Sequence, residues 1–187
     1  MIRGLAITVS NRAAAGVYPD RSGPVLAELL AAAGCSELDG PLVVPDGEPV
    51  LTALREAVAS GYDIVVTTGG TGLTPGDQTP EMTSRVIDRE IPGIADAIRS
   101  AGAAAGVPSA VLSRGLAGLA GRTIIVNLPG SAGGVRDGMA VLSPILAHAV
   151  DQVRGGDHPM PPEGAHPRPP EDAHPQPPGK SAAADQG

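Results

Sequence analysis

The sequence predicts an α/β protein: a three-layer α/β/α domain, doubly wound around a mostly parallel sheet. Short apolar runs alternate with longer blocks in which apolar residues recur every three or four positions, as strands alternate with helices. The strand-like runs are apolar almost throughout, which is typical of parallel strands buried on both faces. The chain has 187 residues, 42% of them apolar, which suffices for one domain with a sizeable core.

Strands are indicated by short runs rich in β-branched and other apolar residues. We expect them at residues 2–9, 41–44, 64–68 and 123–126, with a short additional strand at 110–113. Each of the first three is followed by a helix-like block, which supports the crossover connections of a parallel sheet. The core must be built from aliphatic side chains, because the chain contains neither Phe nor Trp.

Helices are indicated by apolar residues at helical spacing and by capping residues. We expect them at 22–33, at 49–60, from 80 onward with a break or restart at Pro92, and at 131–153. Ser22, Thr79 and Ser131 are the expected N-caps. Pro144 is expected to kink or split the last helix, with Ser143 capping its second piece.

The composition changes sharply near Gly155, which predicts a domain over residues 1–154 and a tail over 155–187. The tail is rich in Pro, His and acidic residues, and a His-Pro-x-Pro-Pro pattern begins at 158, 166 and 174. Such a segment cannot bury enough apolar surface to offset its ordering entropy, so we expect it to be disordered. Metal binding by its histidines and docking of its proline-rich repeat on a partner stay as alternatives.

Charge and hydropathy exclude several classes of function. A net charge of −7 disfavours nucleic acid and anionic membranes as partners. We see no run long enough for a membrane span or a signal-peptide core. Cys35 is the only cysteine, so no internal disulfide can form and a reducing, cytoplasmic location is expected.

Functional residues are expected where the parallel strands end, because doubly wound sheets bind ligands beyond the carboxyl ends of their strands. The segments that follow the predicted strands there are 10–12, 45–47, 69–77 and 127–131. Two of them carry the carboxylates Asp46 and Asp77, which this topology can bring together. Two carboxylates with phosphate oxygens and water form a ligand set that Mg²⁺ prefers.

The glycine-rich loop Gly69-Gly70-Thr71-Gly72 is the strongest local signal. Glycines let backbone N–H groups approach a ligand, and the loop leads into a helix N-terminus that favours an anion. The loop has neither the Gly-Lys-Ser/Thr of a Walker A motif nor the dinucleotide-binding spacing. By itself it fits a tight turn equally well.

The longer segment 67–81 resembles the hallmark loop of the MogA/MoaB family of molybdenum-cofactor proteins, also found as the G domain of gephyrin-type proteins. Other segments agree with this resemblance and follow the order of the family: Ser10 with Arg12, 16–18, 44–46, 111–114 and 125–130. The resemblance spans nearly all of residues 1–154. It leaves the tail outside.

The resemblance implies that the chain adenylylates molybdopterin with ATP and Mg²⁺ and releases pyrophosphate. It further implies a MoeA-type partner for molybdate insertion, and a homotrimer. The functional aspartates of the family correspond to Asp46 and Asp77, which we expect to be catalytic and to hold Mg²⁺. Substrate contacts are expected from Ser10, Thr68, Gly69, Gly70, Thr71, Gly72, Ser113, Asn127, Pro129, Gly130 and Ser131.

Three rival hypotheses remain. A non-catalytic MoaB-type carrier or scaffold would bind the pterin without transferring a nucleotide; the presence of both aspartates favours the enzyme. A CinA-type pyrophosphatase tends to carry Gly-Gly-Leu-Gly and paired aspartates, whereas this chain has Thr71 and a single Asp77. A MoeA-like protein needs additional domains. Two departures from the family pattern are Asn11, where relatives often have Asp, and the Ser-Ala-Gly-Gly continuation at 131–134.

Overall fold

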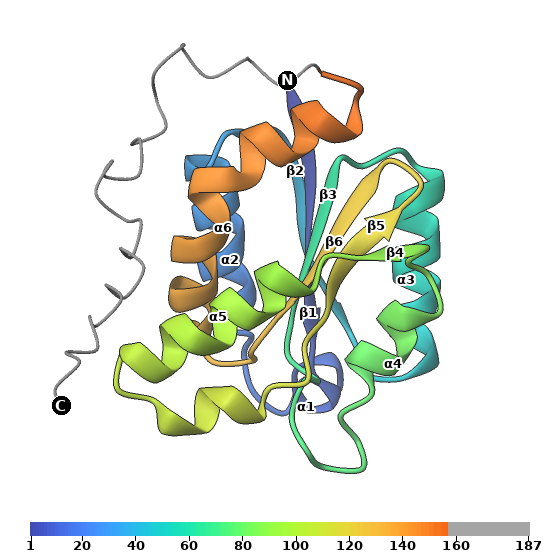
Figure 1. Ribbon diagram of the computed structural model, residues 1–187. Coiled ribbons are helices and arrows are strands. Elements are labelled where there is room, and N and C mark those ends of the chain that lie inside the picture. Colours follow the sequence, from blue (N-terminus) through green and yellow to red (C-terminus); the bar gives the residue numbers. More distant parts are fainter. Residues whose placement is uncertain (157–187) are drawn as a thin grey trace, which may run out of the picture. The chain divides into compact units, whose positions relative to one another are not determined.

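Six strands form one sheet in the computed structural model, which describes residues 1–156 (Figure 1). The strands are β1 (Ile2–Val9), β2 (Cys35–Val44), β3 (Ile64–Thr68), β4 (Arg89–Glu90), β5 (Ala117–Ala120) and β6 (Thr123–Leu128). Their order is β2-β1-β3-β6-β5-β4. Strands β2, β1, β3 and β6 run parallel to one another, whereas β5 pairs antiparallel with both β6 and β4. The predicted tail, apart from Gly155 and Gly156, lies outside the described residues.

Helices cover both faces of this sheet and complete the three layers (Figure 1). One face carries α2 (Ser22–Ala32), α5 (Pro92–Ala104) and α6 (Ala132–Val153); the other carries α3 (Glu48–Ala59) and α4 (Thr79–Ser84). Side chains alternate across each strand, so Leu5 and Ile7 pack toward α3 while Ala6 packs toward α2. The predicted three-layer, doubly wound, mostly parallel fold is confirmed. None of the helices within residues 1–156 is long and apolar enough to cross a membrane.

The edge of the sheet beyond β6 differs from the prediction. Residues 110–113, predicted as a short strand, lie in and just after the 3-10 helix η1 (Pro108–Leu112). The edge is formed instead by β5 and β4, with four and two residues. Strands this short carry too little periodicity to be recognised, and β5 contains Gly118 and alanines in place of β-branched residues.

The helix caps were predicted with mixed success. Ser131 is confirmed as the N-cap of α6, because its hydroxyl accepts a hydrogen bond from the Gly134 N–H. Ser22 is wrong as a cap: it is the first residue of α2, and the Asp20 carboxylate accepts the N–H groups of Ser22 and Gly23. Thr79 is wrong as well, since it is already helical and its hydroxyl bonds elsewhere.

Pro144 does not split the last helix, contrary to the prediction. Helix α6 is continuous over 22 residues with Pro144 inside it. Pro144 is exposed, whereas Leu142 and Leu146 on the opposite side are buried against the sheet. Pro144 lacks the N–H that would bind the Ala140 carbonyl, but Ala140 is exposed, so water can satisfy this carbonyl while packing of the inner face keeps the helix whole.

Candidate active site

The carboxyl ends of the four parallel strands meet at one rim of the sheet. In register, Val9 pairs with Val44, Thr8 with Thr68, and Thr68 with Leu128. The segments that follow these strands therefore emerge together. The winding reverses between β1 and β3, because α2 and α3 lie on opposite faces. A crevice at such a reversal is the general ligand site of doubly wound folds.

Asp46 is held at this rim by an array of donors. Its Oδ1 accepts hydrogen bonds from the Gly47 N–H at 2.8 Å and the Thr79 hydroxyl at 3.3 Å. Its Oδ2 accepts the Gln78 N–H at 3.1 Å. The Asp46 N–H in turn donates to Oδ1 of Asn11 at 2.9 Å, so the segments after β1 and β2 are joined. The carboxylate of Asp46 thus lies against the start of α4.

Asp77 reaches the same region from the glycine-rich loop. Its Oδ2 accepts hydrogen bonds from the Thr74 N–H at 3.0 Å and the Thr74 hydroxyl at 2.6 Å. Within residues 1–156 no hydrogen bond to its Oδ1 is found. Gln78, whose N–H binds Asp46, is the next residue in the chain. The two aspartates, 31 positions apart in the sequence, are thus placed on one rim.

The pKa of Asp46 depends on its burial, on the charge of Asp77 and on the hydrogen bonds that its carboxylate accepts. Partial burial raises the pKa of Asp46 above its ordinary value, and the negative charge of Asp77 raises it further. Hydrogen bonds from Gln78, Gly47 and Thr79 act in the opposite direction. Burial and the neighbouring charge therefore disfavour the ionised form of Asp46.

The glycine-rich loop needs glycine for both conformation and space. Gly69 and Gly70 have φ of +103° and +63°, which side chains other than glycine rarely adopt. A Cβ on Gly69 would collide with the Val9 carbonyl, and one on Gly70 with Asp46 and Thr79. The loop is therefore folded closely over the end of β1 and the Asp46 carboxylate.

Arg114 holds this loop in place through hydrogen bonds to its backbone carbonyls. Its Nε donates to the Gly72 carbonyl at 2.8 Å, its Nη2 donates to the Asp77 carbonyl at 2.6 Å, and its Nη1 pairs with Glu81. The Arg114 N–H also binds the Thr71 carbonyl at 2.9 Å. The guanidinium lowers the pKa of Glu81. Arg114 is therefore a residue that positions the glycine-rich loop.

Thr68 and Asn127, two of the residues expected to contact the substrate, are buried. Asn127 is 3% exposed, and its side-chain amide donates to the Thr67 and Thr83 hydroxyls at 3.0 Å each. The Thr68 hydroxyl donates to the Pro129 carbonyl at 2.8 Å. Direct substrate contact by the side chains of Asn127 and Thr68 does not fit these positions. Both support the segments that form the rim.

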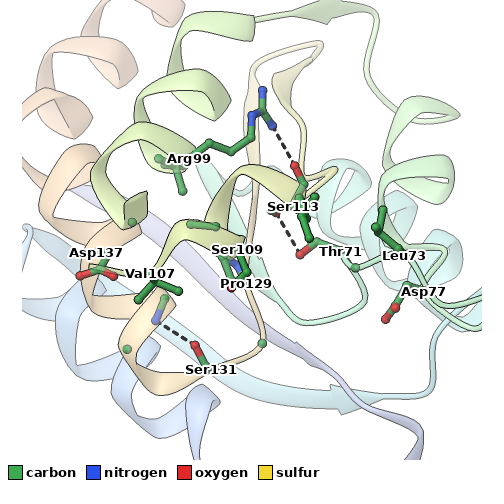
Figure 2. A pocket seen from close by; sticks show the side chains of 18 of the residues that line it. Thr71, Leu73, Asp77, Arg99, Val107, Ser109, Ser113, Pro129, Ser131 and Asp137 are labelled. Carbon is green, nitrogen blue, oxygen red and sulfur yellow. Dashed lines mark hydrogen bonds between the residues drawn. The ribbon is translucent and has the colours of Figure 1, made fainter. Parts of the chain in front are cut away.

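The larger pocket at the rim has a volume of about 610 Å³ (Figure 2). It is walled by the glycine-rich loop, by α5 and η1, and by the segment that opens α6. Of the predicted residues it contains Gly70, Thr71, Gly72, Asp77, Ser113, Pro129, Gly130 and Ser131. The Ser113 hydroxyl donates to that of Thr71 at 3.2 Å, which joins two walls.

A second pocket, of about 410 Å³, adjoins the first at Gly70, Gly130 and Ser131. It lies at the reversal of the winding between β1 and β3. Its lining includes the predicted residues Ser10 and Gly69. The Ser10 hydroxyl accepts the Ala13 N–H at 3.2 Å and so caps α1 (Asn11–Ala14), a short helix that the sequence did not predict.

Several residues of the site were missed in the sequence. The wall formed by α5 and η1 was unforeseen, because residues 110–113 were assigned to a strand. Asp20 lines the second pocket, and Asp137 the first. A signal for Asp137 existed: it lies less than two helical turns after the predicted cap Ser131, on the helix that begins at the rim.

The fold and this rim define a molybdopterin-binding domain. The family model described as "probable molybdopterin binding domain" matches residues 5–148. The Mog protein from Mycobacterium ulcerans, a molybdopterin biosynthesis protein, is 53% identical with a TM-score of 0.78, over 82% of this chain and 99% of that one. MoaB from Thermus thermophilus is 40% identical with a TM-score of 0.74, over 83% and 98%.

Curated relatives agree with the solved structures. A molybdopterin adenylyltransferase of Helicobacter pylori is 34% identical over 80% of this chain and 86% of its own. A bifunctional molybdenum cofactor biosynthesis protein of Synechococcus elongatus is 36% identical over 81% of this chain and 47% of its own. The chain thus spans about half the length of the first curated relatives that it matches. It belongs to the MogA/MoaB family of molybdenum cofactor biosynthesis proteins.

Proposed function

We propose that this protein is a molybdopterin adenylyltransferase that uses Mg²⁺ and ATP. An oxygen of the molybdopterin phosphate attacks the α-phosphorus of ATP, the new P–O bond forms, and the bond to pyrophosphate breaks. The observation that carries the proposal is the placement of Asp46 and Asp77 on one rim, beside a glycine-rich loop that opens into a pocket. The name of the Helicobacter pylori relative supports the same activity.

Reactions between two phosphates require their charges to be neutralised and their groups to be held in line. The site suits a hard cation, because Asp46 and Asp77 supply carboxylate oxygens and each lies against a glycine whose missing Cβ leaves the space open. A bound Mg²⁺ supplies charge neutralisation for the phosphates. The chain's own part is to place the two carboxylates and to line the pocket with loop N–H groups.

The test is pyrophosphate release by the purified protein given molybdopterin, ATP and Mg²⁺, with the adenylylated pterin identified by mass spectrometry. Asp77→Asn keeps the size of the side chain and removes its charge, so we expect turnover to fall by about a hundredfold or more. The matched control is Asp151→Asn, at an exposed position near the end of α6, which should retain activity.

A non-catalytic carrier is the outcome that would contradict the proposal. In that case wild-type protein would bind molybdopterin but release no pyrophosphate, and Asp77→Asn would change neither result. Full turnover by Asp77→Asn would also overturn the role of this residue. Circular dichroism on each variant separates loss of activity from loss of fold.

We further propose a homotrimer in the cytoplasm that passes its product to a MoeA-type molybdate-insertion protein. These proposals rest on the family to which the chain belongs, and the second half of the bifunctional relatives is consistent with a partner activity in the same process. Sedimentation of the purified chain tests the trimer, with a mass near three times 18.5 kDa expected.

A further inference from the structure

The larger pocket is a mostly apolar slot with a carboxylate toward each end. Its walls include Ile98, Val107 and Pro129, whose aliphatic surfaces suit the face of a flat ring. In Figure 2, Asp77 lies at one side of the lining beside Leu73, and Asp137 lies at the other side near Val107. A ligand whose phosphate lies near Asp77 would therefore extend its ring system toward Asp137.

Asp137 differs from the other charged residues of the pocket in having no protein partner. Arg99 is occupied, because its guanidinium donates to Asp96 and to the carbonyls of Ser113 and Gly115. Asp77 accepts from Thr74. Within residues 1–156 no hydrogen bond or ion pair to the Asp137 carboxylate is found, although the side chain is half-buried. It is thus available to accept hydrogen bonds from a ligand.

The chemistry of a carboxylate selects among flat heterocycles. A carboxylate only accepts hydrogen bonds, through two oxygens side by side, and it binds best to two adjacent N–H donors. The 2-amino-4-oxo edge of a pterin presents such a pair at N3–H and the 2-amino group. Adenine presents an amino donor beside ring-nitrogen acceptors, which leaves one carboxylate oxygen facing a lone pair.

From this arrangement we infer that Asp137 is the specificity-determining residue for the pterin ring, binding its N3–H and 2-amino donors in the slot between Val107 and Pro129. The inference deepens the proposed function and rests on it, because it assigns the pterin and not the nucleotide base to the larger pocket. It also orients the pterin so that the phosphate end faces Asp77 and the glycine-rich loop.

Binding of free pterin and of lumazine, measured by fluorescence titration in the absence of ATP, tests the inference. Lumazine has the same ring but carries oxygen in place of the 2-amino group, so its N3–H is flanked by two acceptors. We expect wild type to bind pterin at least about tenfold more tightly than lumazine. Asp137→Asn should lose this preference, Asp137→Glu should keep part of it, and Asp151→Asn should keep all of it.

Two results would overturn the inference: unchanged pterin preference in Asp137→Asn, or loss of AMP affinity without loss of pterin affinity. The first would remove Asp137 from recognition, and the second would assign it to the nucleotide base. The outcome is separable from that of the proposed function. Pterin preference without pyrophosphate release would contradict adenylylation alone, whereas pyrophosphate release with an unchanged pterin KM in Asp137→Asn would contradict the role of Asp137 alone.

Discussion

At the scale of single residues, the two aspartates of the rim are both partly buried, and the charge of Asp77 acts on Asp46. Asp46 has three hydrogen-bond donors, yet its pKa is raised, because burial and the charge of Asp77 outweigh them. A carboxylate in this state is destabilising when ionised.

The raised pKa of Asp46 predicts a pH dependence of stability. Because the folded state holds the proton more tightly than the unfolded state, the contribution of Asp46 is fully present below its usual pKa and is lost as pH rises through the folded pKa. Relative to Asp46→Asn, which does not titrate, wild type should lose free energy of unfolding as the pH rises above the ordinary aspartate pKa of about 3.9. Urea unfolding across this range provides the measurement. A difference that stays constant or grows with pH would contradict the assignment.

At the scale of elements, the loop between β3 and α4 packs closely against the rim. It packs against the end of β1, carries Asp77, and is held by Arg114 from a segment more than 30 residues away. The motif at residues 69–72, from which the sequence predicts the loop, contains the two glycines with positive φ, Gly69 and Gly70. The loop is therefore a rigid support for the site.

Gly70→Ala should destabilise the protein by about 1–3 kcal/mol, because the new Cβ meets Asp46 and Thr79 at a backbone φ of +63°. Gly76→Ala is the control in the same loop: no atom lies within 4 Å of its Cβ position. The free energy of unfolding in urea, measured for both variants, distinguishes them. Equal effects at the two positions would show that the loop relaxes, contrary to the rigid support described here.

At the scale of the whole molecule, mainly aliphatic packing holds the three layers together. Two clusters of buried residues lie on the two faces of the sheet, and Leu26, Leu30, Leu142 and Leu146 are almost completely buried between the sheet and its helices. Because the chain contains neither Phe nor Trp, the layers depend on the close fit of many aliphatic side chains.

Leu146→Ala should therefore cost about 2–5 kcal/mol of stability, as expected for a leucine at 0% exposure. Its neighbour Ile145 is 38% exposed, and Ile145→Ala should cost less than about 1 kcal/mol. Thermal and urea unfolding of the two variants measure the loss of stability at a buried and at an exposed position within one turn of α6. A cost below about 1 kcal/mol at Leu146 would show that the cluster repacks freely.

Local pattern predicted most of the fold and part of the site. Strands β1, β3 and β6 and helices α2, α3 and α6 were predicted because each has clear periodicity or a long apolar run. The short edge strands were missed, because two or four residues carry no period. The caps of α2 and α4 were assigned wrongly, because a serine or threonine at a helix start looks the same whether it caps the helix or begins it.

The sequence by itself determined the α/β class, the rim of the sheet at which we propose the site, and the two aspartates and the glycine-rich loop that reach it. These depend on local periodicity and on the general rule that ligands bind at strand carboxyl ends. Only the tertiary structure decided that Asn127 is a buried support, that Arg114 holds the loop, and that α5 with Asp137 completes the pocket. Those roles depend on which distant segments pack together, and no local pattern carries that information.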